Sequence, residues 1–427
     1  MMDRTETLRR ALHSRRDRLI ALTQAMIRIP TLNPPGEFYR EACELIAAEL
    51  APLGFDCRML RAIGTPGDSD RHPRWNLVAR RTGARPGPCV HFNGHTDVVE
   101  VGQGWTTDPF GGALIDGRIH GRGACDMKGG IAAAIVAVEA FIDLHPDHPG
   151  AIEISATADE ETGGYGGVAW LAGLGIFAHV DHVIIPEPLN KDRVCLGHRG
   201  VWWAEVETFG RIAHGSMPFL GDCAVRHMGA IIAEMEATLL PALARKRTAM
   251  PVVPEAARAS TLNINSIHGG QAEPPPDFTG WPSAVVPDRC RMIVDRRFLA
   301  EEPIAEVKAE FRATLERARQ RRPFAYAVRD MHEVAPSMTD RDAPVAAALA
   351  RAIGATLGRP AEFVVSPGTY DQKHIDRIGR LKNCVAYGPG ILDLAHQPDE
   401  YVGVDDMLDA GLVIALALAD LLGVHAG

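Results

Sequence analysis

The sequence predicts an α/β fold: a mixed, mostly parallel sheet with helices on both faces and an inserted α+β lid domain. Strand-like and helix-like segments alternate through the first half of the chain, as they do in parallel sheets. The middle of the chain changes to strand candidates grouped around one amphipathic helix. The length of 427 residues also exceeds what one hydrophobic core supports, so we expect more than one domain.

The strand and helix candidates of the main domain are short apolar runs and one long Ala-rich segment. A continuous apolar run of this length, bounded by turn residues, is typical of a strand buried inside a parallel sheet. The segment 129–144 is apolar over a length that suits a helix. The expected strands are 88–92, 151–158, 182–185 and 383–387.

The middle of the chain has a different pattern. Residues 222–240 predict an amphipathic helix with Met228, Ile231, Ile232 and Met235 on one face. Residues 271–287 are rich in proline and predict an enlarged loop. Strands are expected at 201–209, 261–267 and 290–298. We therefore expect a catalytic domain formed by 1–198 and 319–427, interrupted by an α+β domain at 199–318.

Composition and charge narrow the functional class. The net charge of -9 argues against nucleic acid as a partner, because a nucleic-acid binder needs a basic surface. The eight cysteines show no CxxC spacing, which argues against a zinc ribbon and favours a reducing, cytoplasmic setting. The charged N-terminal segment lacks the apolar stretch of a signal peptide. The most apolar segments, 129–144 and 407–424, carry acids and read as core helices, so no membrane association is expected.

Metal-capable side chains follow all four strand candidates of the main domain. A fifth, Asp126, comes just before the helix 129–144. Each alone reads as an ordinary structural residue, and Asp126 alone reads as a helix cap. Together they occupy equivalent places, because ligands of open α/β sheets bind at the carboxyl ends of strands. The side chains are His95 and Asp97 after 88–92, Glu160 and Glu161 after 151–158, Glu187 after 182–185, and His396 after 383–387.

This set suits two divalent metal ions. Imidazole and carboxylate ligands favour zinc, with cobalt or manganese as alternatives. Asp126, Glu161 and Glu187 with one hydroxide balance the charge of two such ions, and His95 and His396 would add one nitrogen to each. The two carboxylates left over have other expected roles. Asp97 is spaced to orient His95, and Glu160 points away from Glu161 and is expected to act as general base.

Longer motifs resemble one known family. The chain is similar to the dinuclear metallohydrolases that include acetylornithine deacetylase, succinyl-diaminopimelate desuccinylase and related carboxypeptidases and aminoacylases. The resemblance implies the same five ligands, with Asp126 bridging, and the same roles for Asp97 and Glu160. The motifs are GHTDVV (94–99), Trp105 with Asp108-Pro109-Phe110, GRGACDMKGG (121–130), DEETGG (159–164), PEP (186–188), AHQPDE (395–400), GRIAHGSMP (210–218) and Asp295-Arg296-Arg297.

The resemblance also implies roles for residues that spacing alone does not single out. His214 would stabilise an oxyanion, often in the partner's site, and the inserted domain would be a lid used for homodimerisation. Arg297 would grip a substrate carboxylate, although a salt bridge with Asp295 is the alternative reading. The substrate loop of the family matches Gly368, Thr369 and Tyr370 here.

Two departures from the family pattern bear on the substrate. Ser283-Ala284 stand where the family commonly has Asn before Val-Val-Pro, at the end of the enlarged loop. The substrate loop carries Tyr370, which with Trp202 and Trp203 either lines an aromatic pocket or belongs to the core.

The sequence thus predicts a hydrolase that cleaves an amide-type C–N bond in a small carboxylate-bearing substrate. Deacylation of an N-acyl amino acid is the first reading. The alternatives are a dipeptidase or carboxypeptidase, a hydrolytic deaminase of an aromatic amino-carboxylate and, last, a binding protein without activity.

Overall fold

The structure, a computed structural model, describes residues 4–270, 279–281 and 284–424. Ser283 and much of the predicted loop 271–287 therefore lie outside the described residues. The chain divides into two compact units. The first contains Met1–Gly197, Met338–Val364 and Tyr370–Gly427, and the second contains His198–Ser337 and Val365–Thr369.

The first unit is built on a sheet that has nine strands among the described residues, in the order β1-β2-β6-β3-β7-β15-β8-β13, with β14 also paired to β8. The four central strands, β6, β3, β7 and β15, run parallel, and the pairs β1–β2, β2–β6 and β15–β8 are antiparallel. This mixed, mostly parallel arrangement is the predicted fold class. The strands are β1 (Asp56–Arg61), β2 (Trp75–Thr82), β3 (Arg85–His95), β6 (Pro149–Thr157), β7 (His182–Pro188), β8 (Arg193–His198), β13 (Ser337–Met338), β14 (Glu362–Ser366) and β15 (Cys384–Gly388).

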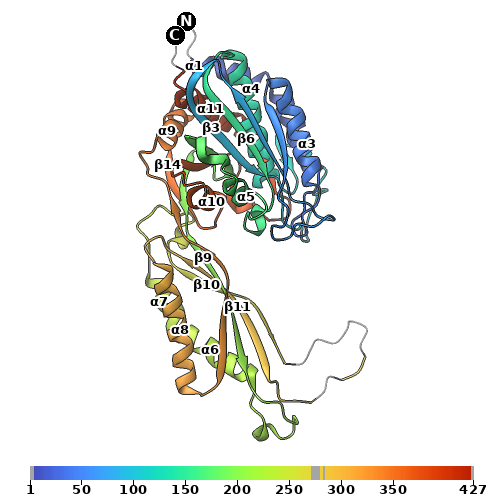
Figure 1. Ribbon diagram of the computed structural model, residues 1–427, viewed down its shortest axis with the longest axis vertical. Helices are drawn as coiled ribbons and strands as arrows, with labels where there is room; N and C mark the ends of the chain where they lie inside the picture. The colour runs from blue at the N-terminus through green and yellow to red at the C-terminus, as the bar shows by residue number, and fades with distance from the viewer. Residues whose placement is uncertain (1–3, 271–278, 282–283, 425–427) are drawn as a thin grey trace. The chain divides into compact units, whose positions relative to one another are not determined.

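Helices cover both faces of this sheet. Two neighbouring residues of β3, which face opposite sides, each lie next to a different helix or its start. A side chain added at Gly94 would meet Ile131 of α4 (Gly129–Leu144). The neighbouring Asn93 points to the other face, where it donates to Asp371 just before α10 (Gln372–Arg377). Because successive strand residues face opposite sides, α4 and α10 lie on opposite faces. The remaining helices of the unit, several of which are labelled in Figure 1, are α1 (Arg4–His13), α2 (Arg16–Ile27), α3 (Tyr39–Leu50), α5 (Val168–Gly173), α9 (Pro344–Leu357) and α11 (Val404–Leu421).

The two most apolar helices form the centre of the core. The bounds of α4 are those predicted, and nearly all of its residues are buried. α11 is buried on almost every side and packs against α4, α9 and α1. Gly411 of α11 lies close to Ala133 and Ala137 of α4, and such small residues let two helices approach closely. Within the described residues, no helix has both the length and the apolar character needed to cross a bilayer.

A small three-stranded sheet completes the described part of this unit. Its order is β16-β5-β4, with both pairs antiparallel. Pairing of β16 with β5 brings the segment just after the AHQPDE motif next to the segment just before the GRGACDMKGG motif. The strands are β4 (Ala113–Ile115), β5 (Arg118–His120) and β16 (Tyr401–Gly403).

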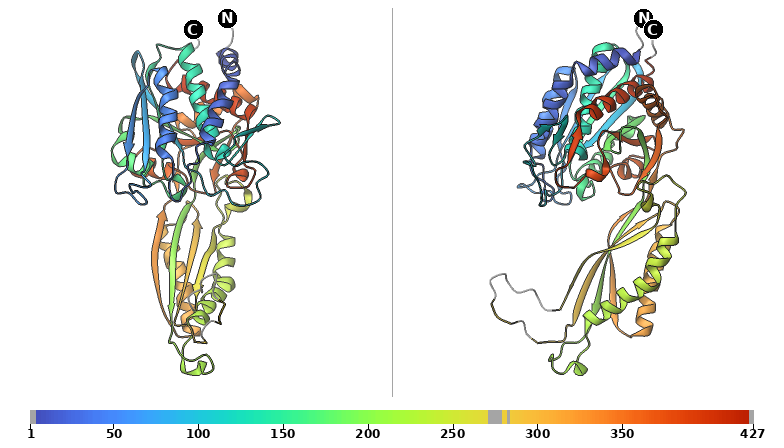
Figure 2. Two further views of the ribbon diagram at one scale, coloured as in Figure 1. Left: turned by 90° about the vertical axis from the view of Figure 1, so that its right-hand side faces the viewer. Right: turned by 180° about the vertical axis from the view of Figure 1, so that it is seen from behind.

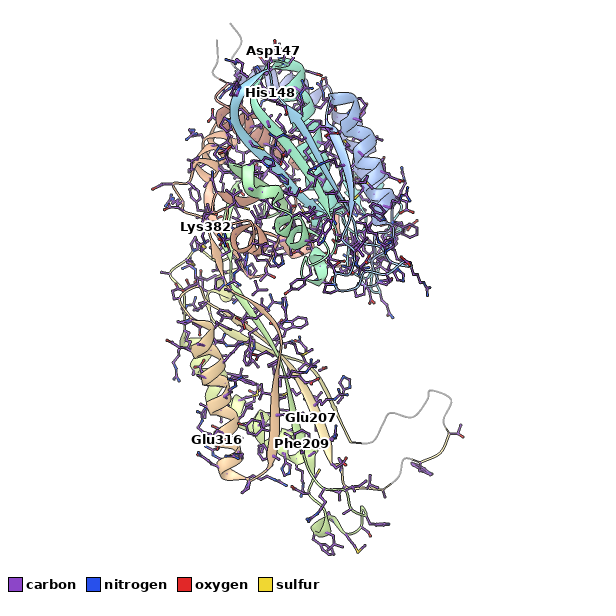
Figure 3. All side chains as sticks on the ribbon, viewed as in Figure 1. Asp147, His148, Glu207, Phe209, Glu316 and Lys382 are labelled. Carbon is purple, nitrogen blue, oxygen red and sulfur yellow. The ribbon has the colours of Figure 1, made fainter. Side chains whose placement is uncertain are left out.

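The second unit is an antiparallel sheet of order β10-β11-β9-β12, packed against helices. Burial alternates along β9 and β11, which is typical of a sheet with one covered face. Figure 2 shows the helices on that one face, and Figure 3 marks Glu207 and Phe209 on β9 and Glu316 on α8. The elements are β9 (Gly200–Phe209), β10 (Thr261–Gly269), β11 (Arg289–Phe298), β12 (Ala325–Val334), α6 (Ala224–Glu234), α7 (Leu240–Arg245) and α8 (Ile304–Arg321).

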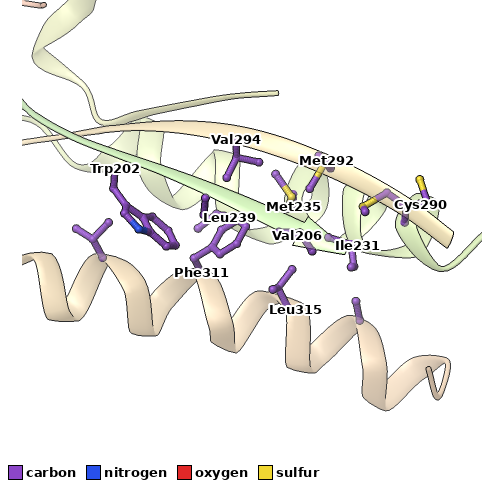
Figure 4. Close-up of a cluster of buried hydrophobic side chains, with 14 of the residues drawn as sticks. Trp202, Val206, Ile231, Met235, Leu239, Cys290, Met292, Val294, Phe311 and Leu315 are labelled. Carbon is purple, nitrogen blue, oxygen red and sulfur yellow. The ribbon is translucent and has the colours of Figure 1, made fainter. Parts of the chain in front are cut away.

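The core of the second unit joins the covered face of the sheet to the helices. Met228, Ile231 and Met235, three of the four residues expected on the apolar helix face, are buried in it, and Ile232 packs against it. Figure 4 shows the side chains of β9 and β11 meeting those of α8 and of the α6 segment.

The inserted segment extends further than the predicted 199–318. β12 pairs with β9 along its length, so the contacts of Ala325–Val334 lie in the second unit rather than in the catalytic one. The short return segment Val365–Thr369 also groups with the second unit. Burial alternates only weakly along β12, an edge strand, so its sequence pattern does not mark it as part of the insert.

Candidate metal centre

The five predicted ligand residues come from the carboxyl ends of the parallel strands and the turns beside them. The topology brings them to one edge of the sheet, as expected for an open α/β fold. His95 is the last residue of β3, Glu187 lies near the end of β7, Glu161 follows β6 in a short helix (Glu160–Thr162), Asp126 lies in the irregular turn Ala124–Lys128 before α4, and His396 lies after β15 in the loop that leads to β16.

His95, Asp126 and Glu161 offer ligand atoms that all lie within 4.8 Å of one another. His95 Nε2 is 3.1 Å from Asp126 Oδ1 and 3.9 Å from Glu187 Oε1. His396 Nε2 is 3.1 Å from Glu161 Oε1 and 3.5 Å from Asp126 Oδ2. Each oxygen of Asp126 thus faces one of the two histidines.

The acids of this cluster crowd one another. Burial raises the pKa of Glu161 to about 7, against the opposing hydrogen bond from His396. Burial and the charge of Asp126 raise the pKa of Glu187 well above its ordinary value. The hydrogen bonds to Asp126 and Glu161 raise the pKa of His396 to about 10. Carboxylates therefore share a buried space in which the histidines are their nearest positive charges.

This donor set fits divalent metal ions. Two imidazoles and three carboxylates are ligands that zinc, cobalt and manganese accept. Burial raises the pKa of Glu161 and of Glu187, whereas at Asp126 burial is outweighed by His396 and His95, which hold the pKa of Asp126 below its ordinary value, so two of the three carboxylates are not fully compensated by the protein. A bound divalent ion would supply that charge.

Asp97 is fully buried and supports the site in a way the spacing did not reveal. Its carboxylate accepts the backbone N–H groups of Glu160 at 3.2 Å and Glu161 at 3.1 Å, and the side-chain N–H of Asn33 at 2.9 Å. His95 Nδ1 lies 3.0 Å from the backbone oxygen of Asp97, closer than the 3.5 Å to its carboxylate. Asp97 therefore orients His95 through its backbone and holds the Glu160-Glu161 turn with its side chain.

Glu400 supports the opposite side of the cluster. Its Oε1 accepts the backbone N–H groups of Cys125 at 2.9 Å and Asp126 at 3.1 Å. Its Oε2 pairs with Arg122 at 2.6 Å, and both side chains are buried. Glu400 was not singled out from the sequence, although it ends the AHQPDE motif that also contains His396.

Glu160, the expected base, has a cation beside it that the sequence did not suggest. Lys373 Nζ donates to Glu160 Oε1 at 2.9 Å, and both side chains are nearly inaccessible to solvent. Asp371 lies nearby, since burial and then the charge of Glu160 raise its pKa to about 7. Asp371 directly follows Tyr370 of the predicted substrate loop, and Lys373 lies in the first turn of α10 (Gln372–Arg377).

Tyr370 itself belongs to the core. It is 5% exposed, and its hydroxyl donates to Gln372 Oε1 at 2.6 Å. Trp202 is fully buried in the core of the second unit. Tyr370 and Trp202, two of the three residues that we considered for an aromatic pocket, are therefore core residues. Gly368 and Thr369 are partly buried, and the backbone N–H of Gly368 donates to Ser366 Oγ at 3.2 Å.

His214 is exposed in the second unit. Its Nδ1 accepts the backbone N–H of Ser216 at 3.1 Å, and residue 214 bridges to Val285. A neutral imidazole that accepts at Nδ1 carries its proton on Nε2. His214 is therefore prepared to donate a hydrogen bond from Nε2.

Arg297 is paired within its own strand. Its Nε and one terminal nitrogen contact the two oxygens of Asp295, at 2.8 and 3.0 Å. This is the salt bridge that we named as the alternative to a substrate grip.

Comparison with known proteins agrees with these motifs. Residues 91–420 match Peptidase family M20/M25/M40. The succinyl-diaminopimelate desuccinylase of Azoarcus sp. (strain BH72) is 32% identical over 373 residues, which are 85% of this chain and 87% of that protein.

Solved structures show the same fold. Human carnosine dipeptidase 1 aligns with a TM-score of 0.78 at 20% identity, covering 99% of this chain and 100% of that one. The M20 family metallo-carboxypeptidase Sso-CP2 from Sulfolobus solfataricus aligns with a TM-score of 0.75 at 18% identity, covering 95% and 99%. The chain therefore belongs to peptidase family M20/M25/M40 and is a metal-dependent hydrolase that acts on C–N bonds.

Proposed function

We propose that this enzyme removes the acyl group from an N-acyl amino acid by hydrolysis of the amide bond. The observation that carries the proposal is the convergence of His95, Asp126 and Glu161 beside Glu160, whose carboxylate pairs with Lys373. The named activity of the desuccinylase relatives supports an acyl substrate.

The proposed cofactor is two divalent ions per chain, zinc first and cobalt or manganese as alternatives. The residues that would hold them are His95, Asp126, Glu161, Glu187 and His396. When bound, such a pair polarises a carbonyl and lowers the pKa of water from 15.7 toward about 7.

The chain's own residues supply positioning and proton transfer. Glu160 would take a proton from the attacking water and pass it to the leaving nitrogen, so that the amine departs neutral. Asp97 supports this step, because it holds the backbone N–H groups of both Glu160 and Glu161. Glu160 is thereby fixed relative to the cluster through the shared turn.

The substrate is proposed to carry a carboxylate, with Gly368, Thr369 and Tyr370 in the loop that borders it. Arg297 is the proposed grip for the carboxylate, since a guanidinium binds a carboxylate at two points. Both oxygens of Asp295 contact the guanidinium group of Arg297, so Arg297 would have to release Asp295 in order to bind the substrate carboxylate.

A second candidate is a dipeptidase or carboxypeptidase, which the likeness to carnosine dipeptidase 1 and to a metallo-carboxypeptidase favours. The hydrolytic deaminase of an aromatic amino-carboxylate stays a further prediction: Tyr370 and Trp202 are core residues, whereas Trp203 of β9 is only partly buried.

A substrate screen tests the proposal. N-succinyl, N-acetyl and N-formyl amino acids, dipeptides and aminobenzoates would be offered to enzyme loaded with zinc, cobalt or manganese. We expect the highest kcat/KM with an N-acyl amino acid, and none after chelation. A clear preference for dipeptides would move the assignment to the second candidate, and turnover that survives complete metal removal would overturn the mechanism.

We further propose a homodimer formed through the lid, in which His214 donates to the oxyanion of the partner's site. The support is an exposed imidazole prepared to donate from Nε2, in a loop with exposed apolar residues such as Ile212 and Phe219. Loss of one oxyanion donor typically costs about 10²–10³ in kcat.

Subunit mixing tests the sharing. His214→Ala and Glu160→Ala subunits would be combined under exchange, and each mixed dimer would then hold one intact site if His214 acts across the interface. We expect activity to return well above that of either variant alone. Verified mixed dimers that stay inactive would place His214 in its own chain's site or outside catalysis.

A cytoplasmic setting is proposed as well. All eight cysteines are free, which suits a reducing compartment.

A further inference from the structure

Lys373 and the expected base Glu160 form an ion pair that is shielded from solvent. Lys373 Nζ lies 2.9 Å from Glu160 Oε1, and the two side chains are 2% and 10% exposed. Solvent ions screen a buried pair much less than a surface pair. The contact is to one oxygen of the carboxylate, which leaves the other oxygen free of Lys373.

Lys373 lies in the first turn of α10, and the core holds the start of this helix. On one side, Tyr370 donates to Gln372, whose side-chain N–H group donates to the backbone oxygen of Leu196 at 3.1 Å and of Cys384 at 2.8 Å. The position of the Lys373 backbone is therefore set by buried hydrogen bonds and does not depend on its ion pair.

Asp371 holds the other side of this helix start to the sheet. It accepts from Asn93 at 2.8 Å and from Thr157 at 3.4 Å, residues of β3 and β6. His95 ends β3, and Glu160 follows β6 by three residues. The start of α10, which carries Lys373, is thus held to the two strands that lead to the expected metal ligand His95 and the expected base Glu160.

Charge balance also indicates that the positive charge of Lys373 pairs with Glu160. The three carboxylates of Asp126, Glu161 and Glu187, with one hydroxide, already balance two divalent ions. Burial alone lowers the pKa of Lys373, but Glu160 and Asp371 outweigh it, so the pKa is raised and the side chain is a cation. Its ammonium group donates a hydrogen bond to the carboxylate of Glu160.

We propose that Lys373 is a positioning residue for catalysis: its ammonium group pins Oε1 of Glu160 and so directs Oε2 at the attacking water. Without this contact the carboxylate can rotate, and a proton acceptor that is misplaced by about 1 Å costs on the order of 10² in rate. The inference rests on the proposed role of Glu160 as base.

A double-mutant cycle between the two residues tests it on the metal-loaded enzyme. Lys373→Met keeps the length of the side chain and removes the charge, and Glu160→Gln removes the base. We expect Lys373→Met to lower kcat about 10²-fold, with KM changed less than about 3-fold and metal content at the wild-type level. In the Glu160→Gln background the same change should lower kcat less than about 3-fold, because Lys373 acts only through Glu160.

Two further variants serve as controls for this experiment. Lys373→Arg keeps the cation and should recover most of the lost kcat. If Lys373→Met does not fold, Lys373→Arg is measured in its place. A kcat of Lys373→Arg as low as that of Glu160→Gln would then count against the pairing. Lys191→Met is the matched control, because Lys191 pairs with Asp406 and Asp409 away from the site and should keep wild-type kinetics.

The outcomes separate the inference from the proposed function. An unchanged kcat in Lys373→Met, an equal loss in both backgrounds or a loss of bound metal would each overturn the role of Lys373. If Glu160→Gln itself keeps near-native kcat, the proposed base is wrong whatever Lys373 does.

Discussion

Two clusters in the first unit contain the residue types of a metal site. Only one of them contains carboxylates whose charge the surrounding protein does not fully neutralise. Among the described residues, these two are the groups of three or more His, Cys, Asp or Glu whose ligand atoms all lie within 4.8 Å of one another. Both draw residues from β3 and from β6 or the turn after it. The first is His95, Asp126 and Glu161, and the second is Cys89, Glu153 and His179.

The second cluster is already neutralised by protein groups. Glu153 contacts Arg80, His91 at 3.0 Å and His179 at 2.6 Å. Burial acts against its charge, but these partners outweigh burial and lower the pKa of Glu153 to about 2. Burial and the charge of Glu153 raise the pKa of the Cys89 thiol to about 12, so it holds its proton at neutral pH, whereas a metal binds the thiolate.

The first cluster is only partly neutralised: burial acts against the charge of Asp126, but His396 and His95 outweigh burial and hold the pKa of Asp126 well below its ordinary value. The pKa values of Glu161 and Glu187 are raised, mainly by burial, and the buried Lys373 is paired with Glu160. The comparison teaches that donor atoms close together do not define a metal site. The charge that the protein leaves uncompensated does.

Replacing one carboxylate in each cluster should give the largest contrast. Asp126→Ala removes the oxygens that face both histidines, so we expect loss of bound metal and a fall in kcat of more than about 10³-fold, because the activated water is lost. Glu153→Gln should keep metal content and kcat near wild type. Elemental analysis and steady-state kinetics measure both, and metal loss in Glu153→Gln alone would reverse the comparison.

Glu160→Gln sharpens the comparison within the first cluster. It keeps the shape of the side chain and leaves the five expected ligands untouched, so metal should remain bound. Kcat should fall by about 10²–10⁴, the usual contribution of general acid–base catalysis. Glu161→Gln is the matched control, since it should weaken metal binding in a calorimetric titration. Equal metal loss in both variants would count against separate roles.

Glu153 of the second cluster should affect the stability of the fold and not the activity. A carboxyl with a lowered folded pKa stabilises the fold above its unfolded pKa, and the stabilisation is lost as the pH falls toward the folded value. For Glu153 the window runs from its ordinary 4.5 down to about 2, and the shift corresponds to about 3 kcal/mol.

The measurement is thermal unfolding of wild type and Glu153→Gln at several pH values. The wild type should melt at a higher temperature at pH 6, and the difference should narrow from about pH 5 to about pH 2. A difference that stays constant over this range would show that the variant acts through packing and not through the charge of Glu153.

Local pattern was enough for much of the fold and for most of the candidate site. Apolar runs between turn residues predicted the four central strands, and the residues after them are the ones that gather at one edge of the sheet. This works because the carboxyl ends of parallel strands share an edge, so a residue's place after a strand already tells where its side chain lies.

What the sequence by itself determined is therefore the α/β class, the helix at Gly129–Leu144 and the set of groups that can bind metal. Only the tertiary structure decided which groups neutralise one another. Lys373 meets Glu160 across 213 residues, and Glu400 meets Cys125 across 275, separations over which no periodic pattern carries information. The same holds for β12, which joins the second unit by pairing with the distant β9. Chain folding sets such distances, and charge balance depends on distance rather than on order along the chain.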